Sequence, residues 1–153
     1  MIYYYHYILI LWKGCMMKTL LATLFLLSNL MAITAKDAAW VLDAQTDMNK
    51  AYDIAKTKKK KLILLVVIRD GCNWCEMMVH ETLRNKNVKS HLADMVVVIA
   101  DFDSSTAKQF NTTLTPSVYF IDPKTKKRID EHIGYEQPGS FIMDIISAEE
   151  KAD

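Results

Sequence analysis

The clearest segment in the hydrophobic pattern of this chain is the continuous apolar run Leu62–Ile68. An uninterrupted run of this kind, partly β-branched, is typical of a strand that is buried on both faces of a sheet. Other apolar or alternating segments predict further strands at residues 40–42, 95–100, 117–121 and 128–133, the last two joined by a turn at residues 122–125.

Between these strands, apolar residues recur at the spacing of one helix face. After Cys72 the residues Cys75, Met78 and Val79 fall on one stripe, and His80 falls on the polar side. Helices are expected over residues 46–55 with Thr46 as the cap, from 72, over 88–92 and 104–110, and from about 140 onward. This order predicts an α/β domain, with a mixed central sheet flanked by helices on both faces.

The first 35 residues differ in composition from the rest. They carry two lysines, four of the seven tyrosines and no acidic residue. Lys18, the apolar run that follows it and the small residues up to Ala35 have the parts of a secretory signal peptide, and we expect cleavage near Ala35. Residues 1–15 are expected to be an over-extended start, so that Cys15 is absent from the mature protein. The apolar core is shorter than the roughly 20 residues of a membrane span, and an uncleaved anchor is the alternative.

Residues 36–153 are long enough for one domain with one core. They hold 17 basic and 18 acidic residues, so their net charge of −1 favours neither nucleic acid nor an anionic membrane as a partner. The lysine run at 58–61 is interpreted as a solvated helix end. No cofactor is expected.

Cys72 and Cys75 are the candidate chemical centre, because they lie where the apolar strand ends and the amphipathic helix begins. At a helix N-terminus the free N–H groups and the helix dipole stabilise an anion, so Cys72 is expected to be the nucleophilic thiolate. Cys75, nearly one turn later on the apolar stripe, is expected to act second and resolve a mixed disulfide.

Four other uses of the two cysteines compete with thiol-disulfide exchange. A purely structural disulfide of this ring size removes only roughly 2 kcal/mol of chain entropy. A zinc site needs two more ligands, and His80 and His91 lack zinc-finger spacing from the cysteines. Haem attachment requires histidine directly after Cys75, where the chain has Glu76. A binding module whose cysteines are incidental remains open.

The cysteine pair occurs together with other motifs, and the combination resembles the thioredoxin family. The strand Leu62–Ile68 leading into residues 71–75 is similar to that family's active-site strand, loop and helix. Residues 114–120 resemble its cis-proline loop and the following strand, and Gly134 with the last helix resembles its closing glycine loop. The resemblance covers roughly residues 39–148 and implies a thioredoxin-like fold.

The resemblance also implies a substrate groove beside the cysteines. By match, Thr115 and Pro116 present the backbone to a partner's chain, and Trp74 and the loop at Gly134 and Tyr135 line the groove. The chain is most similar to the exported branch that includes SoxW-type and other thiol:disulfide interchange proteins. The expected function is therefore a periplasmic thiol-disulfide oxidoreductase that reduces or exchanges disulfides in exported proteins. A monomer is expected.

The direction of electron flow depends on the residues near the nucleophile. Asn73 and Trp74 bring no charge to stabilise a thiolate, which favours a reducing potential near that of thioredoxin and implies a membrane electron donor. A net oxidant or isomerase is the alternative, as is a binding or chaperone module. The family's buried acid, which helps to deprotonate the second cysteine, is replaced by Val66, and neither Glu76 nor His80 is assigned that role.

Overall fold

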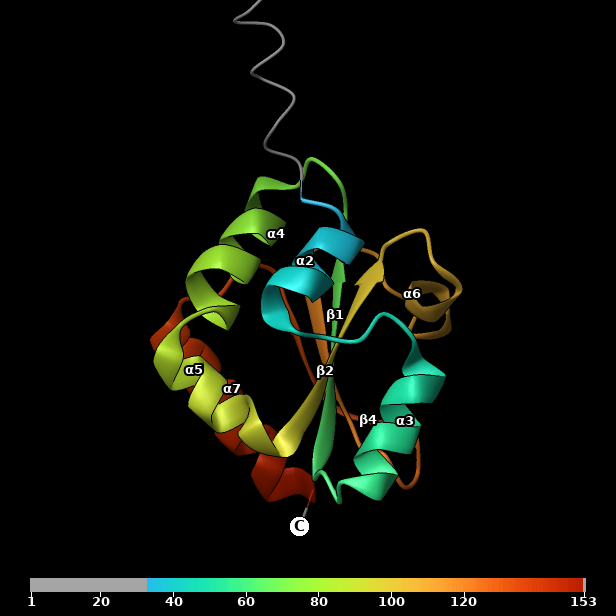
Figure 1. Ribbon diagram of the computed structural model, residues 1–153. Helices are drawn as coiled ribbons and strands as arrows, with labels where there is room; N and C mark the ends of the chain where they lie inside the picture. The colour runs from blue at the N-terminus through green and yellow to red at the C-terminus, as the bar shows by residue number, and fades with distance from the viewer. Residues whose placement is uncertain (1–32, 153) are drawn as a thin grey trace, which may run out of the picture. The chain divides into compact units, whose positions relative to one another are not determined.

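The computed structural model describes residues 33–152 (Figure 1). Its sheet has four strands in the order β2-β1-β3-β4. The strands are β1 (Leu62–Ile68), β2 (Met95–Asp101), β3 (Ser117–Ile121) and β4 (Arg128–Ile133). β1 pairs in parallel with β2 and antiparallel with β3, and β3 pairs antiparallel with β4. The predicted mixed sheet is confirmed, and β1, β3 and β4 have the predicted bounds.

Helices cover both faces of this sheet. The elements are α2 (Ala35–Leu42), α3 (Met48–Thr57), α4 (Asn73–Met77), the π-helix η1 (Met78–Leu83), α5 (Lys86–His91), the 3-10 turn η2 (Leu92–Asp94), α6 (Ser105–Gln109) and α7 (Pro138–Ala152). Figure 1 shows α4, α5 and α7 on one side of β1 and β2, with α3 and α6 on the other.

The core is divided by β1, every residue of which is fully buried. Successive side chains of a strand point to opposite faces, so β1 supplies both cores. Leu64 and Val66 pack in the cluster that includes Cys75 of α4 and Phe141 of α7, whereas Leu65 packs in the cluster that includes α3 and α6. α4 and α7 therefore share one hydrophobic core.

The prediction of a strand at residues 40–42 is wrong, because these residues belong to α2. The Thr34 hydroxyl oxygen accepts a hydrogen bond from the Asp37 N–H at 3.2 Å and caps the start of this helix. Ala38 and Ala39 face the core, while Trp40 is 85% exposed. A capped, alanine-rich segment has a better helix than strand propensity, and three apolar residues are too few to define a strand period.

Two other helix starts differ from the prediction. Asp47 rather than Thr46 caps α3, because Asp47 Oδ1 accepts the N–H groups of Asn49 at 2.7 Å and Lys50 at 3.2 Å. The last helix begins at Pro138, two residues before Ser140. Proline suits a first helical position, since its missing N–H would have no partner inside the helix.

The turn between β3 and β4 is held by one carboxylate. Asp122 Oδ1 accepts the Lys124 N–H at 2.8 Å, and Asp122 Oδ2 accepts the Thr125 hydroxyl at 2.7 Å. The hydrogen bond from Thr125 is the main cause that lowers the pKa of Asp122 in the fold, and burial opposes it. The ionised side chain therefore stabilises the folded state.

Replacement of Asp122 with asparagine is expected to cost about 1 kcal/mol of stability at pH 7, because two hydrogen bonds lose a charged acceptor. A lowered folded-state pKa contributes stability that is present above the unfolded value, near 3.8, and is lost as the pH falls through the folded value. The difference between wild type and Asp122→Asn should therefore shrink below pH 4 in urea denaturation. The exposed Asp103→Asn is the control, and an unchanged difference at pH 3 and pH 7 would contradict the role of charge.

The predicted leader, residues 1–35, lies outside the described residues except for its last three. Ile33 is buried and its N–H donates to Glu76 Oε1 at 3.3 Å, so the ordered domain begins before the predicted cleavage point near Ala35. Across residues 33–152 we find no helix with the length and apolar character needed to span a membrane.

Candidate redox site

The two cysteines lie at the junction of β1 and α4. Gly71, between β1 and α4, turns the chain with a φ of +68°, a left-handed conformation that glycine adopts at little cost. Cys72 is the N-cap of α4, and its Sγ accepts the Cys75 N–H at 3.2 Å. Cys72 and Cys75 form a disulfide, with a Cα–Cα distance of 5.2 Å that lies in the usual range.

The two sulfurs differ in their access to a partner. Cys75 lies on the buried face of α4 and is fully covered by the core, while Cys72 is only half-buried. After reduction, an incoming disulfide can therefore reach Cys72 and not Cys75. This difference fits the predicted division of roles, with Cys72 as the attacking thiol and Cys75 as the resolving thiol.

The Thr115–Pro116 segment lies against the exposed sulfur. Thr115 Oγ1 donates to Cys72 Sγ at 3.6 Å, and the Thr115 carbonyl oxygen is 3.8 Å from the same sulfur. The peptide bond between Thr115 and Pro116 is cis. Together with the Cys75 N–H, the Thr115 hydroxyl gives Cys72 two neutral donors that stabilise negative charge on sulfur.

The loop after β4 completes the surroundings of Cys72. Gly134 donates its N–H to the Pro116 carbonyl at 2.8 Å, so this loop is joined directly to the cis-proline segment. Trp74 is 58% exposed and its ring stacks on Tyr135, with ring centroids 5.7 Å apart. Thr115, Pro116 and Gly134, which are distant from the cysteines in sequence, are therefore brought to the same region as Cys72 and Trp74.

Tyr135 and the residue after it are held in place by the π-helix η1. Its hydroxyl donates to Glu81 Oε2 at 2.9 Å, and this hydrogen bond is the main cause that raises the pKa of Tyr135. The Thr82 hydroxyl donates to the backbone carbonyl of the next loop residue, Glu136. Glu81 and Thr82 were not predicted as loop supports, because residues 54 positions apart carry no local signal.

The two candidates for accepting the Cys75 proton are engaged elsewhere. Val66 is fully buried in the core shared with Cys75 and offers no proton acceptor. Glu76 accepts the Ile33 N–H, and His80 Nδ1 lies 3.4 Å from Arg84 Nη1 on the exposed helix surface.

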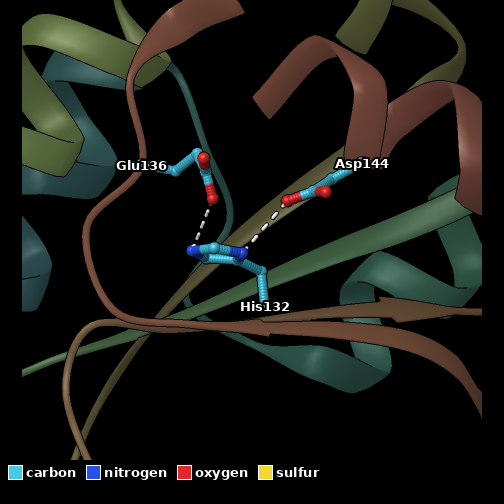
Figure 2. Close-up of side chains that lie close together, drawn as sticks. All are labelled: His132, Glu136 and Asp144. Carbon is cyan, nitrogen blue, oxygen red and sulfur yellow. Dashed lines mark ion pairs between the residues drawn. The ribbon is translucent and has the colours of Figure 1, made fainter. Parts of the chain in front are cut away.

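A polar cluster that the sequence did not reveal includes one residue of the loop after β4 (Figure 2). His132 of β4 has Nε2 3.0 Å from Glu136 Oε2 and Nδ1 3.1 Å from Asp144 Oδ2. The three residues come from a strand, a loop and α7. No motif could have indicated the cluster, because it depends on how α7 packs against β4.

Comparisons with known proteins agree with this geometry. A family model described as a thioredoxin-like domain matches residues 48–143. The structure is similar to a thioredoxin from Thermus thermophilus, with 18% identity, a TM-score of 0.61, and coverage of 68% of this chain and 85% of that one. A search of curated proteins found no match.

Two further solved structures share the fold at low identity. One is described as DsbH oxidoreductase, with 21% identity, a TM-score of 0.59, and coverage of 70% of this chain and 85% of that one. The other is the oxidised C-terminal domain of Neisseria meningitidis DsbD, with 18% identity, a TM-score of 0.55, and coverage of 71% and 98%. At these identities the likeness establishes the fold.

Proposed function

We propose that this chain, which belongs to the thioredoxin-like family, is an exported thiol-disulfide oxidoreductase. Its substrates in this proposal are periplasmic proteins. The placement of Cys72 is the observation that carries this function. Its sulfur caps a helix, is reachable from outside, and has the Thr115 hydroxyl and the Cys75 N–H as donors. These features favour a thiolate at the one position where a partner can approach.

The cycle transfers two electrons from the reduced pair to a partner disulfide. The Cys72 thiolate attacks one partner sulfur, forms a mixed disulfide and releases the other partner sulfur as a thiolate. Cys75 then loses its proton and attacks Cys72 Sγ, which breaks the mixed disulfide and releases the second partner thiolate. The chain is left with the Cys72–Cys75 disulfide, which is the state of this structure.

The exported branch and the reducing direction are part of the proposal. Export is supported by the signal-like composition of residues 1–35, and the SoxW-type assignment rests on the resemblance around the redox pair. Cleavage immediately before Ile33 would keep the buried Ile33 and the Thr34 cap in the mature domain. A reductase in an oxidising compartment requires a membrane donor that delivers electrons from the cytoplasm.

A redox titration against glutathione tests the direction of electron flow. The thiolate donors at Cys72 are neutral groups, and Asn73 and Trp74 carry no charge. We therefore expect a midpoint potential nearer to the value of about −270 mV for thioredoxin than to about −120 mV for the oxidant DsbA. A midpoint above about −180 mV, the value typical of disulfide isomerase, would exclude the reducing assignment.

Replacement of Trp74 with alanine is expected to raise the KM for protein disulfides several-fold, because the exposed ring and its stack with Tyr135 are lost from the groove. The rate with hydroxyethyl disulfide, which is too small to span the groove, should change little. Trp40→Ala removes an even more exposed tryptophan from α2 and is the matched control. Equal losses with the large and small substrates would show that Trp74 acts on the cysteines rather than on partner binding.

Partner trapping with Cys75→Ser tests the mechanism and identifies the substrates. Without the resolving thiol, mixed disulfides between Cys72 and partner proteins should accumulate in periplasmic extracts and disappear on addition of dithiothreitol. A binding or chaperone module with incidental cysteines would instead retain its partners through non-covalent contacts. In that case the same proteins would be captured by Cys72→Ser and Cys75→Ser, and none would be covalently linked.

A further inference from the structure

We propose that His132, Glu136 and Asp144 form a site for one zinc ion, separate from the cysteines. The three side chains converge from β4, the following loop and α7, and their ligand atoms all lie within 4.8 Å of one another (Figure 2). Zinc binds histidine nitrogen and carboxylate oxygen at about 2.0–2.2 Å, which places tetrahedral ligand atoms roughly 3.4 Å apart. Glu136 and Asp144 face different nitrogens of the His132 ring, so one carboxylate must rotate toward the nitrogen that the other faces for one ion to bind all three residues, with water in the fourth position.

Two buried polar atoms of the cluster have no hydrogen bond. His132 Nε2 and Asp144 Oδ2 are both buried, and within residues 33–152 neither atom has a hydrogen-bond partner. His132 Nε2 lies 3.0 Å from Glu136 Oε2, and Asp144 Oδ2 lies 3.1 Å from His132 Nδ1, but neither contact has hydrogen-bond geometry. Buried polar atoms in native proteins are nearly always paired, and a bound ion is one of the few reasons for an exception.

The charge of the cluster also favours a cation. Two carboxylates face a single imidazole, and the nearby Lys151 is already paired with Asp130 at 2.6 Å. A divalent ion would neutralise both carboxylates, whereas one imidazolium neutralises only one of them.

The position of the cluster connects it to the groove. The Glu136 carbonyl accepts the Thr82 hydroxyl, and the preceding residue, Tyr135, stacks on Trp74. Zinc bound through the Glu136 side chain would therefore fasten the loop at residues 134–137 to α7. This inference does not depend on the proposed function, because metal binding is measured without any redox reaction.

Isothermal titration of ZnCl2 into chelator-treated, oxidised protein tests the site. The disulfide must be intact, because reduced cysteines bind zinc themselves. We expect one equivalent to bind, and at least about tenfold weaker binding by Glu136→Gln and His132→Ala. His91→Ala, on α5, should bind as the wild type does. Glu136→Gln keeps the shape of the side chain, so it remains informative if His132→Ala misfolds.

Amide chemical shifts locate the bound ion independently. Zinc added to oxidised protein labelled with nitrogen-15 should shift the signals of residues 134–137 and Asp144, and should leave those of α3 unchanged. The inference is wrong if the wild type shows no saturable binding, if Glu136→Gln and His132→Ala bind zinc as tightly as the wild type does, or if the shifts map to another surface.

Discussion

Replacement of Cys72 with serine is expected to reduce the rate of insulin reduction by at least about a hundredfold, to the rate of dithiothreitol alone. A serine hydroxyl remains protonated at neutral pH, so the two donors around Cys72 Sγ have no thiolate to stabilise. Cys75 cannot attack the insulin disulfide in its place, because Cys75 is fully buried on the core face of α4. The measurement is turbidity from precipitated insulin B chain, with dithiothreitol as the electron source.

Trp40→Ala is the control, since it removes an exposed side chain of α2 from the mature domain and leaves both cysteines in place. This variant should keep the wild-type rate. If Cys72→Ser retained more than a tenth of the wild-type rate, the buried Cys75 would have to be reachable, and the assignment of roles would be reversed. Binding of unfolded insulin without reduction, by both variants alike, would instead favour a chaperone module.

Much of the fold could be predicted because the strands have long, uniform patterns. The run Leu62–Ile68 contains no polar residue and lies between two helical layers, so one unambiguous signal corresponds to one buried strand. The β3–β4 pair could also be predicted, because the turn residues that begin at Asp122 separate the apolar segment Ser117–Ile121 from Arg128–Ile133, where Ile129 and Ile133 lie on one face of an extended chain. In each case the local pattern and the tertiary environment favour the same conformation.

The errors occur where local and tertiary signals disagree or are absent. Residues 40–42 are apolar, yet the Thr34 cap and the core contacts of Ala38 and Ala39 favour a helix. The π-helix Met78–Leu83 has no composition signature that distinguishes it from an α-helix. Such features depend on how neighbouring turns pack, which periodicity does not report.

The redox site was predictable in part, for a similar reason. Cys72 and Cys75 are three positions apart, so their spacing and the helix start are both local features. The residues that support the loop at residues 134–137, called the groove loop below, lie far from it in sequence. Thr82 reaches Glu136, and His132 meets Asp144 of α7 only because the sheet and helices pack as they do. Tertiary packing therefore decides the part of the site that holds the loop in place.

Packing of α7 also determines how stable the domain is, and Phe141→Ala is expected to show this. Phe141 is fully buried, and its ring centre lies 6.3 Å from that of Phe120 on β3. Truncation of a buried phenylalanine costs about 3–5 kcal/mol, a large share of a typical total stability of about 5–15 kcal/mol. The urea midpoint should therefore fall by about 1 M or more.

Met143→Ala is the matched control on the same helix, because this side chain is 63% exposed. Its stability should stay within about 0.5 kcal/mol of the wild type. α7 also carries Asp144 behind the groove loop, so partial release of the helix in Phe141→Ala should loosen that loop before global unfolding. Faster amide exchange at residues 134–137 in Phe141→Ala than in Met143→Ala, below the urea transition, is the expected sign. Equal exchange in the two variants would show that the loop is held by Thr82 and Glu81 alone.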